Sequence, residues 1–230
     1  MLLAVDTSTT QVGIALYDGV QVIGASSWYG KLRHTTSLAP EIDALLKRTN
    51  HKIDDLSALG VAIGPGSFTS LRVGLSLMKG LALARSLPLI GVPTLDILSA
   101  TVATRDIRLA CLLQAGRGRL AVGYYNASDT GGWESEDNLS VMRIDELVES
   151  IEEPTLICGE LSAEEREIIA KVELAELCSP ARSLRNPASL AEIAWERYQA
   201  KNTRAEPSRS ADDAASLSPI YLQVGAQIPS

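Results

Sequence analysis

The stretch VAIGPGSFTSLRVG (residues 61–74) joins a β-branched apolar run to a long helical pattern through two glycines and a proline. Gly64 and Gly66 permit close approach of another backbone, and Pro65 stiffens the turn. Ser67 is suited to cap the helix that follows, whose free N–H groups and dipole suit an anion. No Gly-Lys-Ser/Thr sequence follows, so the loop is not a Walker A motif. The stretch predicts a phosphate-binding loop or, as the simpler alternative, a tight strand-to-helix turn.

Hydrophobic periodicity on both sides of this stretch predicts alternating strands and helices in the first half of the chain. Strand-like runs lie at 2–5, 12–17, 20–25, 59–63 and 88–92, and helical patterns at about 35–49, 67–86 and 95–104. Asp18-Gly19 is a strong hairpin signal, because both residues accept a positive φ. The predicted order is three strands, helix, strand, helix, strand, helix.

The second half of the chain predicts the same order of elements, although its sequence identity to the first half is negligible. Strand-like runs lie at 108–113, 120–125, 139–143 and 155–158, and helical patterns at 145–151, 163–172 and 187–200. Residues 126–134 are expected to form a loop. Two βββαβα halves predict an α/β protein with the duplicated, RNase H-like architecture of actin-like ATPases.

The predicted boundary between the halves lies near residue 105, which gives an N-terminal half at 1–105 and a C-terminal half at 106–230. Within the second half, the polar residues 200–219 are expected to form a linker. The apolar sequence PIYLQV after this linker is expected to dock back onto the body of the protein. A frayed tail is the alternative that composition leaves open.

A second candidate site is the turn Asp6-Thr7-Ser8 between the first two predicted strands. Hydroxyl groups and backbone N–H groups in such a turn can donate to phosphate, and the aspartate can hold Mg²⁺, often through water. The alternative is a hydrogen-bonded turn that only closes a hairpin.

Composition and charge exclude several classes of function. Hydrophobic residues make up 46% of the chain and the formal net charge is −7, which argues against a broad nucleic-acid surface. Cys111, Cys158 and Cys178 are widely spaced and odd in number, which disfavours a disulfide framework and a zinc site. No apolar run reaches membrane-spanning length and MLLAVDTST lacks a basic leader, so we expect a cytoplasmic protein with no membrane contact.

The helix predicted at 67–86 is too apolar for an ordinary surface helix. Arg72, Ser76 and Lys79 form one narrow polar strip, and apolar residues with Gly74 and Gly80 occupy most of the remaining surface. Covering a sheet needs an apolar face of only about 100°. The pattern therefore predicts either a helix buried on two sides within the monomer or a second face, with the small residues Gly74 and Gly80, that meets another protein.

Four stretches together resemble the TsaB family: LLAVDTST, HTTSLAPEIDALL, AIGPGSFTSLRVG and LPLIGVPTLDIL. The match covers roughly the first hundred residues, is thin afterwards and returns at SPIYL. The resemblance implies an actin-like fold shared with the catalytic subunit TsaD. It further implies a non-catalytic dimerisation subunit that pairs with TsaD and helps recruit the ATPase TsaE. That complex transfers threonylcarbamoyl to the adenosine beside the anticodon in tRNAs that read ANN codons, so tRNA is met only through the complex.

The sequence departs from the catalytic relatives where those carry functional groups. Thr94 and Leu98 stand at the positions of their metal-binding histidines, which leaves no metal site there. Gln114-Ala115-Gly116-Arg117 replaces the Asp-Ala-Arg that is common in TsaB relatives. We therefore expect no catalytic residue and no cofactor of its own, with ATP and Mg²⁺ belonging to the complex and weak nucleotide binding left open. The residues of such a vestigial nucleotide or phosphate site are Asp6, Thr7, Ser8, Gly64, Gly66 and Ser67.

The resemblance places the partner interface on helices of the N-terminal half. The expected interface residues are Leu38, Ile42, Leu45, Leu71, Gly74, Leu77, Met78 and Leu81. The partners implied are TsaD in a heterodimer and TsaE, with a homodimer also possible. The rival hypothesis is an autonomous ATP-binding phosphotransferase or ATPase that uses the Asp6 turn and the loop from Gly64 to Ser67.

Overall fold

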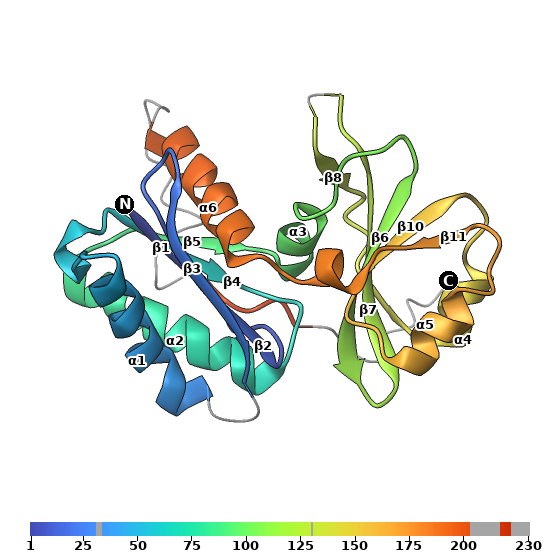
Figure 1. Cartoon of the computed structure of the whole chain (residues 1–230), viewed down its shortest axis with the longest axis horizontal. Helices are drawn as coiled ribbons and strands as arrows, with labels where there is room; N and C mark the ends of the chain where they lie inside the picture. Colours follow the sequence, from blue (N-terminus) through green and yellow to red (C-terminus); the bar gives the residue numbers. More distant parts are fainter. Residues whose placement is uncertain (31–33, 130, 203–216, 222–230) are drawn as a thin grey trace. The chain divides into compact units, whose positions relative to one another are not determined.

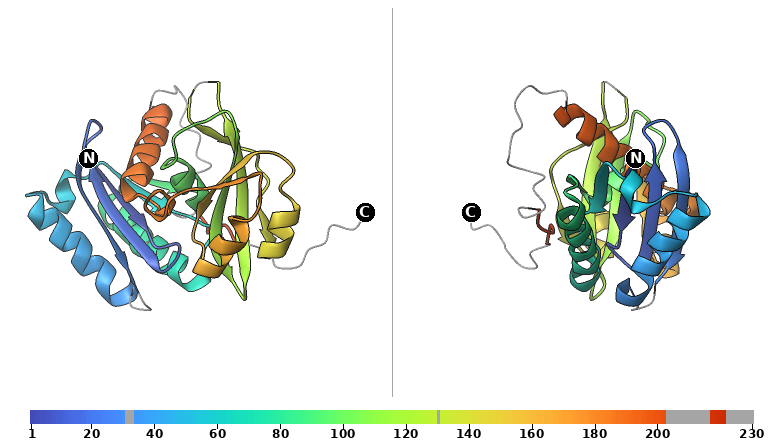
Figure 2. Two further views of the ribbon diagram at one scale, coloured as in Figure 1. Left: turned by 45° about the vertical axis from the view of Figure 1, so that its right-hand side comes forward. Right: turned by 90° about the vertical axis from the view of Figure 1, so that its left-hand side faces the viewer.

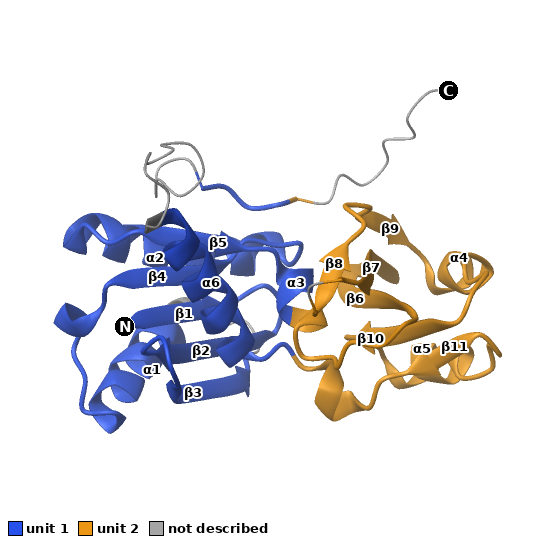
Figure 3. Ribbon diagram, turned by 90° about the horizontal axis from the view of Figure 1, so that it is seen from above, with its two compact units in different colours: residues 1–97, 185–220 blue, residues 98–184, 221–230 orange. Residues whose placement is uncertain are grey.

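The computed structural model describes residues 1–30, 34–129, 131–202 and 217–221. Its contacts divide the chain into two compact units (Figures 1 and 3). The first unit holds residues 1–97 and 185–220, and the second holds residues 98–184 with the chain end. Among the described residues, no helix has the length and apolar character needed to cross a bilayer.

The first unit is a five-stranded sheet with helices on both faces. Its elements are β1 (Leu2–Asp6), β2 (Gln11–Tyr17), β3 (Val22–Tyr29), α1 (His34–Arg48), η1 (Ile53–Asp55), β4 (Ala58–Ala62), α2 (Phe68–Arg85), β5 (Leu89–Val92), the first four residues of α3 (Thr94–Ser99) and α6 (Pro187–Asn202). The strand order is β3-β2-β1-β4-β5, in which β1, β4 and β5 are parallel while β2 and β3 run antiparallel.

Two apolar layers hold the first unit together, one on each face of the sheet. Every residue of β1 is buried because the strand lies in the middle of the sheet and is covered on both faces. Leu3 and Val5 pack with α1 and α2, whereas Leu2 and Ala4 pack with α6. The helices α1 and α2 thus lie on one face and α6 on the other, as Figures 1 and 2 show.

The second unit is a six-stranded sheet with short helices. Its elements are β6 (Arg108–Gly116), β7 (Arg119–Ala127), β8 (Trp133–Ser135), β9 (Ser140–Met142), α4 (Ile144–Glu149), β10 (Thr155–Gly159), α5 (Ala163–Ile169), β11 (Ala175–Leu177) and η2 (Pro180–Ser183). The strand order is β11-β10-β6-β7-β8, and β9 also pairs with β7. The strands β8 and β11, of three residues each, were not among the predicted elements, and the expected loop at 126–134 instead holds the end of β7 and the start of β8.

The end of the chain departs from the predicted division into halves at 1–105 and 106–230. The helix α6 packs its Leu190, Ala191 and Ala194 on the first sheet, so the first unit is discontinuous in sequence. Element order alone could not show this return, because an amphipathic helix fits either sheet. After it, residues 203–216 of the expected linker lie outside the described residues. Leu217 is buried and the N–H of Ile220 donates to the carbonyl of Ile63 at 2.7 Å, so this part of the tail contacts the first unit.

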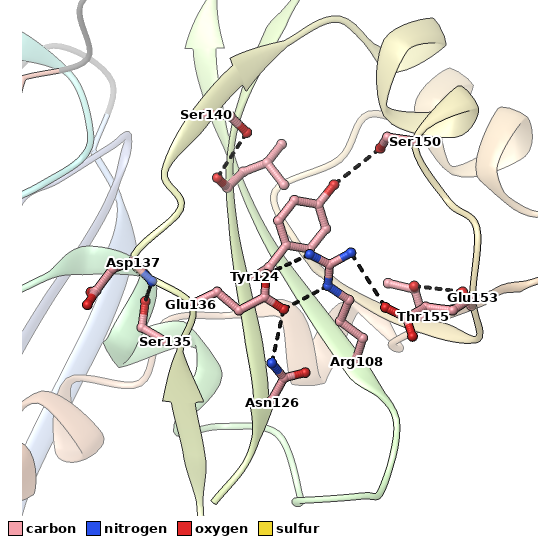
Figure 4. A network of polar contacts seen from close by, with 11 residues as sticks. Arg108, Tyr124, Asn126, Ser135, Glu136, Asp137, Ser140, Ser150, Glu153 and Thr155 are labelled. Atoms are coloured by element: carbon pink, nitrogen blue, oxygen red, sulfur yellow. Dashed lines mark hydrogen bonds and ion pairs between the residues drawn. The ribbon is translucent and has the colours of Figure 1, made fainter.

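A polar network joins the strands of the second unit around Arg108 (Figure 4). The guanidinium of Arg108 donates to both carboxylate oxygens of Glu136 at 2.8 and 2.6 Å. It also lies over the ring of Tyr124, 4.0 Å from the ring centre. Asn126 donates a further bond to Glu136 at 3.1 Å. The network therefore ties β6 and β7 to the segment after β8.

At pH 7, Glu136→Gln is expected to lower the free energy of unfolding by about 1.5–3 kcal/mol, the contribution of hydrogen bonds to a charged group. Hydrogen bonding from Arg108 holds the pKa of Glu136 below its ordinary value. The stabilisation is therefore complete above the ordinary carboxyl pKa and is lost as the pH falls through the lowered folded pKa. In denaturant titrations the difference between wild type and variant should shrink below about pH 4.5. Glu153→Gln is the control, because Glu153 is exposed and 3.6 Å from Arg108; its effect should stay below about 1 kcal/mol.

Candidate functional site

The Asp6 turn is closed by an arginine from the far end of the chain. One carboxylate oxygen of Asp6 accepts the N–H of Ser8 at 2.8 Å. The other accepts Nε of Arg185 at 2.7 Å, and the two side chains are only 4% and 1% exposed. The carboxylate that the sequence offers as a Mg²⁺ ligand is thus already neutralised by a buried guanidinium.

Arg185 also satisfies the rest of the turn. Its Nη2 donates to the hydroxyl of Thr9 at 2.7 Å and to the carbonyl of Gln11 at 3.0 Å. The residue precedes α6, whose packing on the first sheet fixes where the side chain enters. A cation already fills the place beside Asp6, so the residues present do not fit a metal ion there. Among the described residues, no group of three or more histidine, cysteine or acidic side chains could hold a metal.

The glycine loop packs directly on the Asp6 turn instead of standing open. The N–H of Ser67 donates to the carbonyl of Ser8 at 2.7 Å. A Cβ at Gly66 would overlap that same carbonyl, so only glycine permits this approach. Ser67 caps α2 by accepting the N–H of Ser70 at 3.4 Å. The Ser67 N–H therefore bonds to protein, not toward a ligand.

Thr94 ties the two loops together. Its hydroxyl is 2.7 Å from the hydroxyl of Ser8 and accepts the N–H of Gly64 at 3.1 Å. Thr7 adds a bond from its hydroxyl to the carbonyl of Ser70 at 2.7 Å. Thr94 stands where the sequence resemblance places a histidine of the catalytic relatives, and here it makes a structural bond. The predicted site residues therefore lie close together, in two loops that are packed and hydrogen-bonded to each other.

Gly74 of α2 packs against the Asp6 turn, at Thr7. A Cβ at this position would overlap the hydroxyl oxygen of Thr7, whereas a Cβ at Gly80 of the same helix would meet nothing within 4 Å. The two glycines, which the sequence analysis grouped on one candidate interface face, therefore have different surroundings.

Gly74→Ala is expected to lower the free energy of unfolding by about 1–3 kcal/mol, because the added methyl group overfills a packed site. Gly80→Ala is the matched control in the same helix and should raise it by about 0.5–1 kcal/mol, since the open position accepts the side chain and the glycine entropy cost disappears. Chemical denaturation followed by circular dichroism measures both. Equal effects at the two positions would contradict the packing of Gly74 against Thr7.

Most of the expected interface residues lie in the core, which corrects that expectation. The residues with at most 3% exposure are Leu38, Leu45, Leu71 and Met78, and Gly74 is buried as well. Ile42 is 6% exposed, whereas Leu77 and Leu81 are half-buried and pack at the margin of the core cluster. A helical wheel shows that one side of α2 is apolar. Which residues of that side a partner protein can reach depends on how α1 packs against α2.

A groove between α1 and α2 contains the accessible members of that set. We call it the α1–α2 groove; it has a volume of about 850 Å³ and is lined mainly by Ile42, Leu46, Leu77, Gly80, Leu81 and Ala84. A second hollow of about 600 Å³ shares Ala39, Ser76 and Leu77 with it and reaches Phe68 and Arg72. Phe68 is 53% exposed, and the guanidinium of Arg72 lies 3.6 Å from its ring centre. The first unit thus presents a continuous, largely apolar strip.

Comparison with known proteins matches both the fold and the sequence. Residues 30–210 match the family model of TsaD, the tRNA N6-adenosine threonylcarbamoyltransferase. The structure is similar to YeaZ from Pseudomonas aeruginosa, with a TM-score of 0.72 and 23% identity over 96% of this chain and 99% of that one. It is also similar to the ethanolamine utilization protein EutJ from Carboxydothermus hydrogenoformans, with a TM-score of 0.51 and 13% identity over 83% and 88% of the two chains. The chain therefore has the actin-like ATPase fold, as predicted.

The sequence relatives identify the family within that fold. The tRNA threonylcarbamoyladenosine biosynthesis protein TsaB of Bacillus subtilis is 31% identical over 173 residues, which are 74% of this chain and 76% of that one. TsaB of Escherichia coli is 30% identical over 145 residues, 62% of each chain. The chain belongs to the TsaB family, which confirms the resemblance drawn from its motifs.

Arg185 is the functional-site residue that sequence reasoning missed. It lies 179 positions from Asp6, in a segment without a motif. The available signal was a single arginine directly before a helix N-terminus, at Arg185-Asn186-Pro187. Such a signal carries no information about which carboxylate the arginine meets.

Proposed function

We propose that this chain is a non-catalytic subunit of the machinery that makes threonylcarbamoyladenosine in tRNA. The observation that carries the proposal is the buried pair of Asp6 and Arg185. In an ATPase of this fold, a carboxylate in this turn would face Mg²⁺ and phosphate, and here it faces a guanidinium of its own chain. Membership of the TsaB family supports the assignment to this biosynthesis.

The partner in this proposal is a TsaD-type subunit, bound at the α1–α2 groove. The groove is largely apolar, although Asp43, Lys47 and Lys52 also belong to its lining, and helices on one face of the first sheet build it. The half-buried Leu77 and Leu81 supply side chains that a partner helix can cover, and apolar burial is the main drive for such association. A second copy of this chain could use the same surface, so a homodimer would compete with the heterodimer.

Contact with tRNA is proposed to pass through the partner, because the net charge of −7 opposes direct binding of a polyanion. Recruitment of a TsaE-type ATPase to the assembled pair belongs to the same proposal. ATP and Mg²⁺ are then cofactors of the complex and not of this chain.

Light scattering of this chain mixed with the TsaD-type subunit of the same organism tests the proposal. The expected mass is the sum of the two chains, with loss of any homodimer peak as the partner is added. Failure to form a complex, even with the TsaE-type subunit and ATP present, would overturn the scaffold assignment.

Calorimetry with ATP and Mg²⁺ separates the proposal from an autonomous ATPase. The isolated chain is expected to give no tight binding, because Asp6, Ser67 and Thr94 are engaged with protein groups. Micromolar binding that Asp6→Asn abolishes, in a variant that still folds, would favour the autonomous enzyme instead.

A further inference from the structure

The fold aligns three cysteines that are distant in sequence. Cys111 in β6 and Cys158 in β10 are direct partners in the parallel register. Cys178 directly follows β11, where Leu177 pairs with Ile157, and its N–H donates to the carbonyl of Ile157 at 2.8 Å. The three thiols therefore form a row across neighbouring strands of the second unit.

The row lies on the sheet face opposite α4 and α5. Ile157 and Leu177 pack in the cluster that contains Leu147 of α4 and Ile169 of α5. Because successive side chains of a strand point to opposite faces, Cys158 and Cys178 point the other way. The contacts of Cys158 agree, since its thiol donates to the carbonyl of Arg182 in η2 at 3.2 Å.

Cys158 and Cys178 are close enough for a disulfide. The register that pairs Ile157 with Leu177 places Cys158 beside Cys178, and each thiol shifts the pKa of the other. Neighbouring strands lie about 4.8 Å apart, and disulfides span Cα separations of about 4.4–6.8 Å. The pair thus requires little backbone movement to form a bond.

Several features favour Cys178 over Cys111 as the reactive partner of Cys158. Cys178 is 6% exposed at the end of its strand, whereas Cys111 is fully buried in the interior of the sheet. Arg166 donates to the carbonyl of Cys178 at 3.1 Å, which brings a positive charge to this end of the row. The neighbouring Cys158 thiol, together with the charges of Arg182 and Arg166, lowers the pKa of the Cys178 thiol. A thiolate is the form that attacks oxidants.

We propose that Cys158 and Cys178 are a redox modification site that a small hydroperoxide converts to a reversible disulfide. The Cys178 thiolate attacks the peroxide oxygen, the O–O bond breaks, and a sulfenic acid forms with release of alcohol or water. The Cys158 sulfur then attacks the sulfenic sulfur, which forms the S–S bond and releases one water. The two thiols lose two electrons and two protons, and the peroxide is reduced. A dithiol reverses the reaction by exchange.

The bond would change the attachment of η2. The thiol of Cys158 donates to the carbonyl of Arg182, and a disulfide sulfur has no proton to donate. The turn that precedes Arg185 would therefore lose one of its anchors. The site acts on the conformation of the second unit and does not depend on the proposed function of the first.

Mass spectrometry of the intact, folded chain treated with hydrogen peroxide tests the proposal. The expected product has lost two hydrogen atoms, and digestion yields a cross-linked peptide pair that contains Cys158 and Cys178 and separates after treatment with dithiothreitol. Cys111→Ser should still form the product, and Cys178→Ser should not. Cross-linking of Cys158 to Cys111, stable oxygen adducts without a cross-link, or no reaction in a chain shown to be folded would each overturn the proposal.

Discussion

Arg185→Met is expected to lower the free energy of unfolding by about 3–5 kcal/mol, the cost of leaving one member of a buried ion pair without its partner. The side chain is 1% exposed and holds Asp6 at 2.7 Å, Thr9 at 2.7 Å and the carbonyl of Gln11 at 3.0 Å. Methionine fills a similar volume but leaves the Asp6 carboxylate buried and unpaired. Denaturant titration of the intact chain measures the loss.

Two control variants separate the buried charge from packing. Arg143→Met removes a similar ion pair whose side chains are 67% and 62% exposed, so its effect should stay below about 1 kcal/mol. Asp6→Asn combined with Arg185→Met removes the orphaned charge and keeps an oxygen for the N–H of Ser8. This double variant should be more stable than Arg185→Met alone. A loss at Arg185 no larger than that at Arg143 would contradict the described pairing.

Local chemistry explains why the strand, glycine loop and helix around residues 61–74 could be predicted. Ser67 caps α2 and the helix ends at Arg85, as the sequence pattern from 67 to 86 indicates; the left-handed conformation of Ser86 that follows is seen only in the structure. The apolar runs of β1 and β4 likewise specify buried parallel strands. Such signals depend on neighbours in sequence, so a single chain displays them.

Long-range pairing explains what the sequence could not provide. The hydroxyl of Thr94 could serve a ligand or a neighbouring loop, and only the fold shows that Ser8 and Gly64 are its partners. The same holds for the cysteines. Their spacing in the sequence showed no metal-binding or disulfide motif, but the pairing of β6, β10 and β11 places them side by side. Residue type indicates what a side chain can do, and topology decides what it meets.

The expected interface residues on α2 also show that residue type alone does not determine what a side chain contacts. Met78 is fully buried between α2 and the sheet, whereas Leu77, the residue before it, lines the α1–α2 groove. Met78→Glu would place a charge in the core and unfold the first unit, so it cannot report on binding. Leu77 is the position that separates recognition from stability.

Leu77→Glu is expected to weaken binding to the TsaD-type subunit at least about thirtyfold, the effect of losing a binding hot spot of about 2 kcal/mol. Leu77 lines both hollows of the groove, so a partner side chain seated in either would meet the introduced carboxylate. Because Leu77 is half-buried and packs against the core cluster, the variant should fold with a lowered unfolding midpoint, so binding is measured at a temperature where circular dichroism shows it folded.

Leu83→Glu is the matched control on the same helix. Leu83 is 72% exposed and lies outside the lining of both hollows, so the same charge there should leave the dissociation constant within about threefold of the wild type. Calorimetric titration of each folded variant with the TsaD-type subunit measures the difference. If Leu77→Glu binds like wild type while Leu83→Glu does not, the partner uses the outer side of α2, and the groove assignment fails even though the subunit still forms the complex.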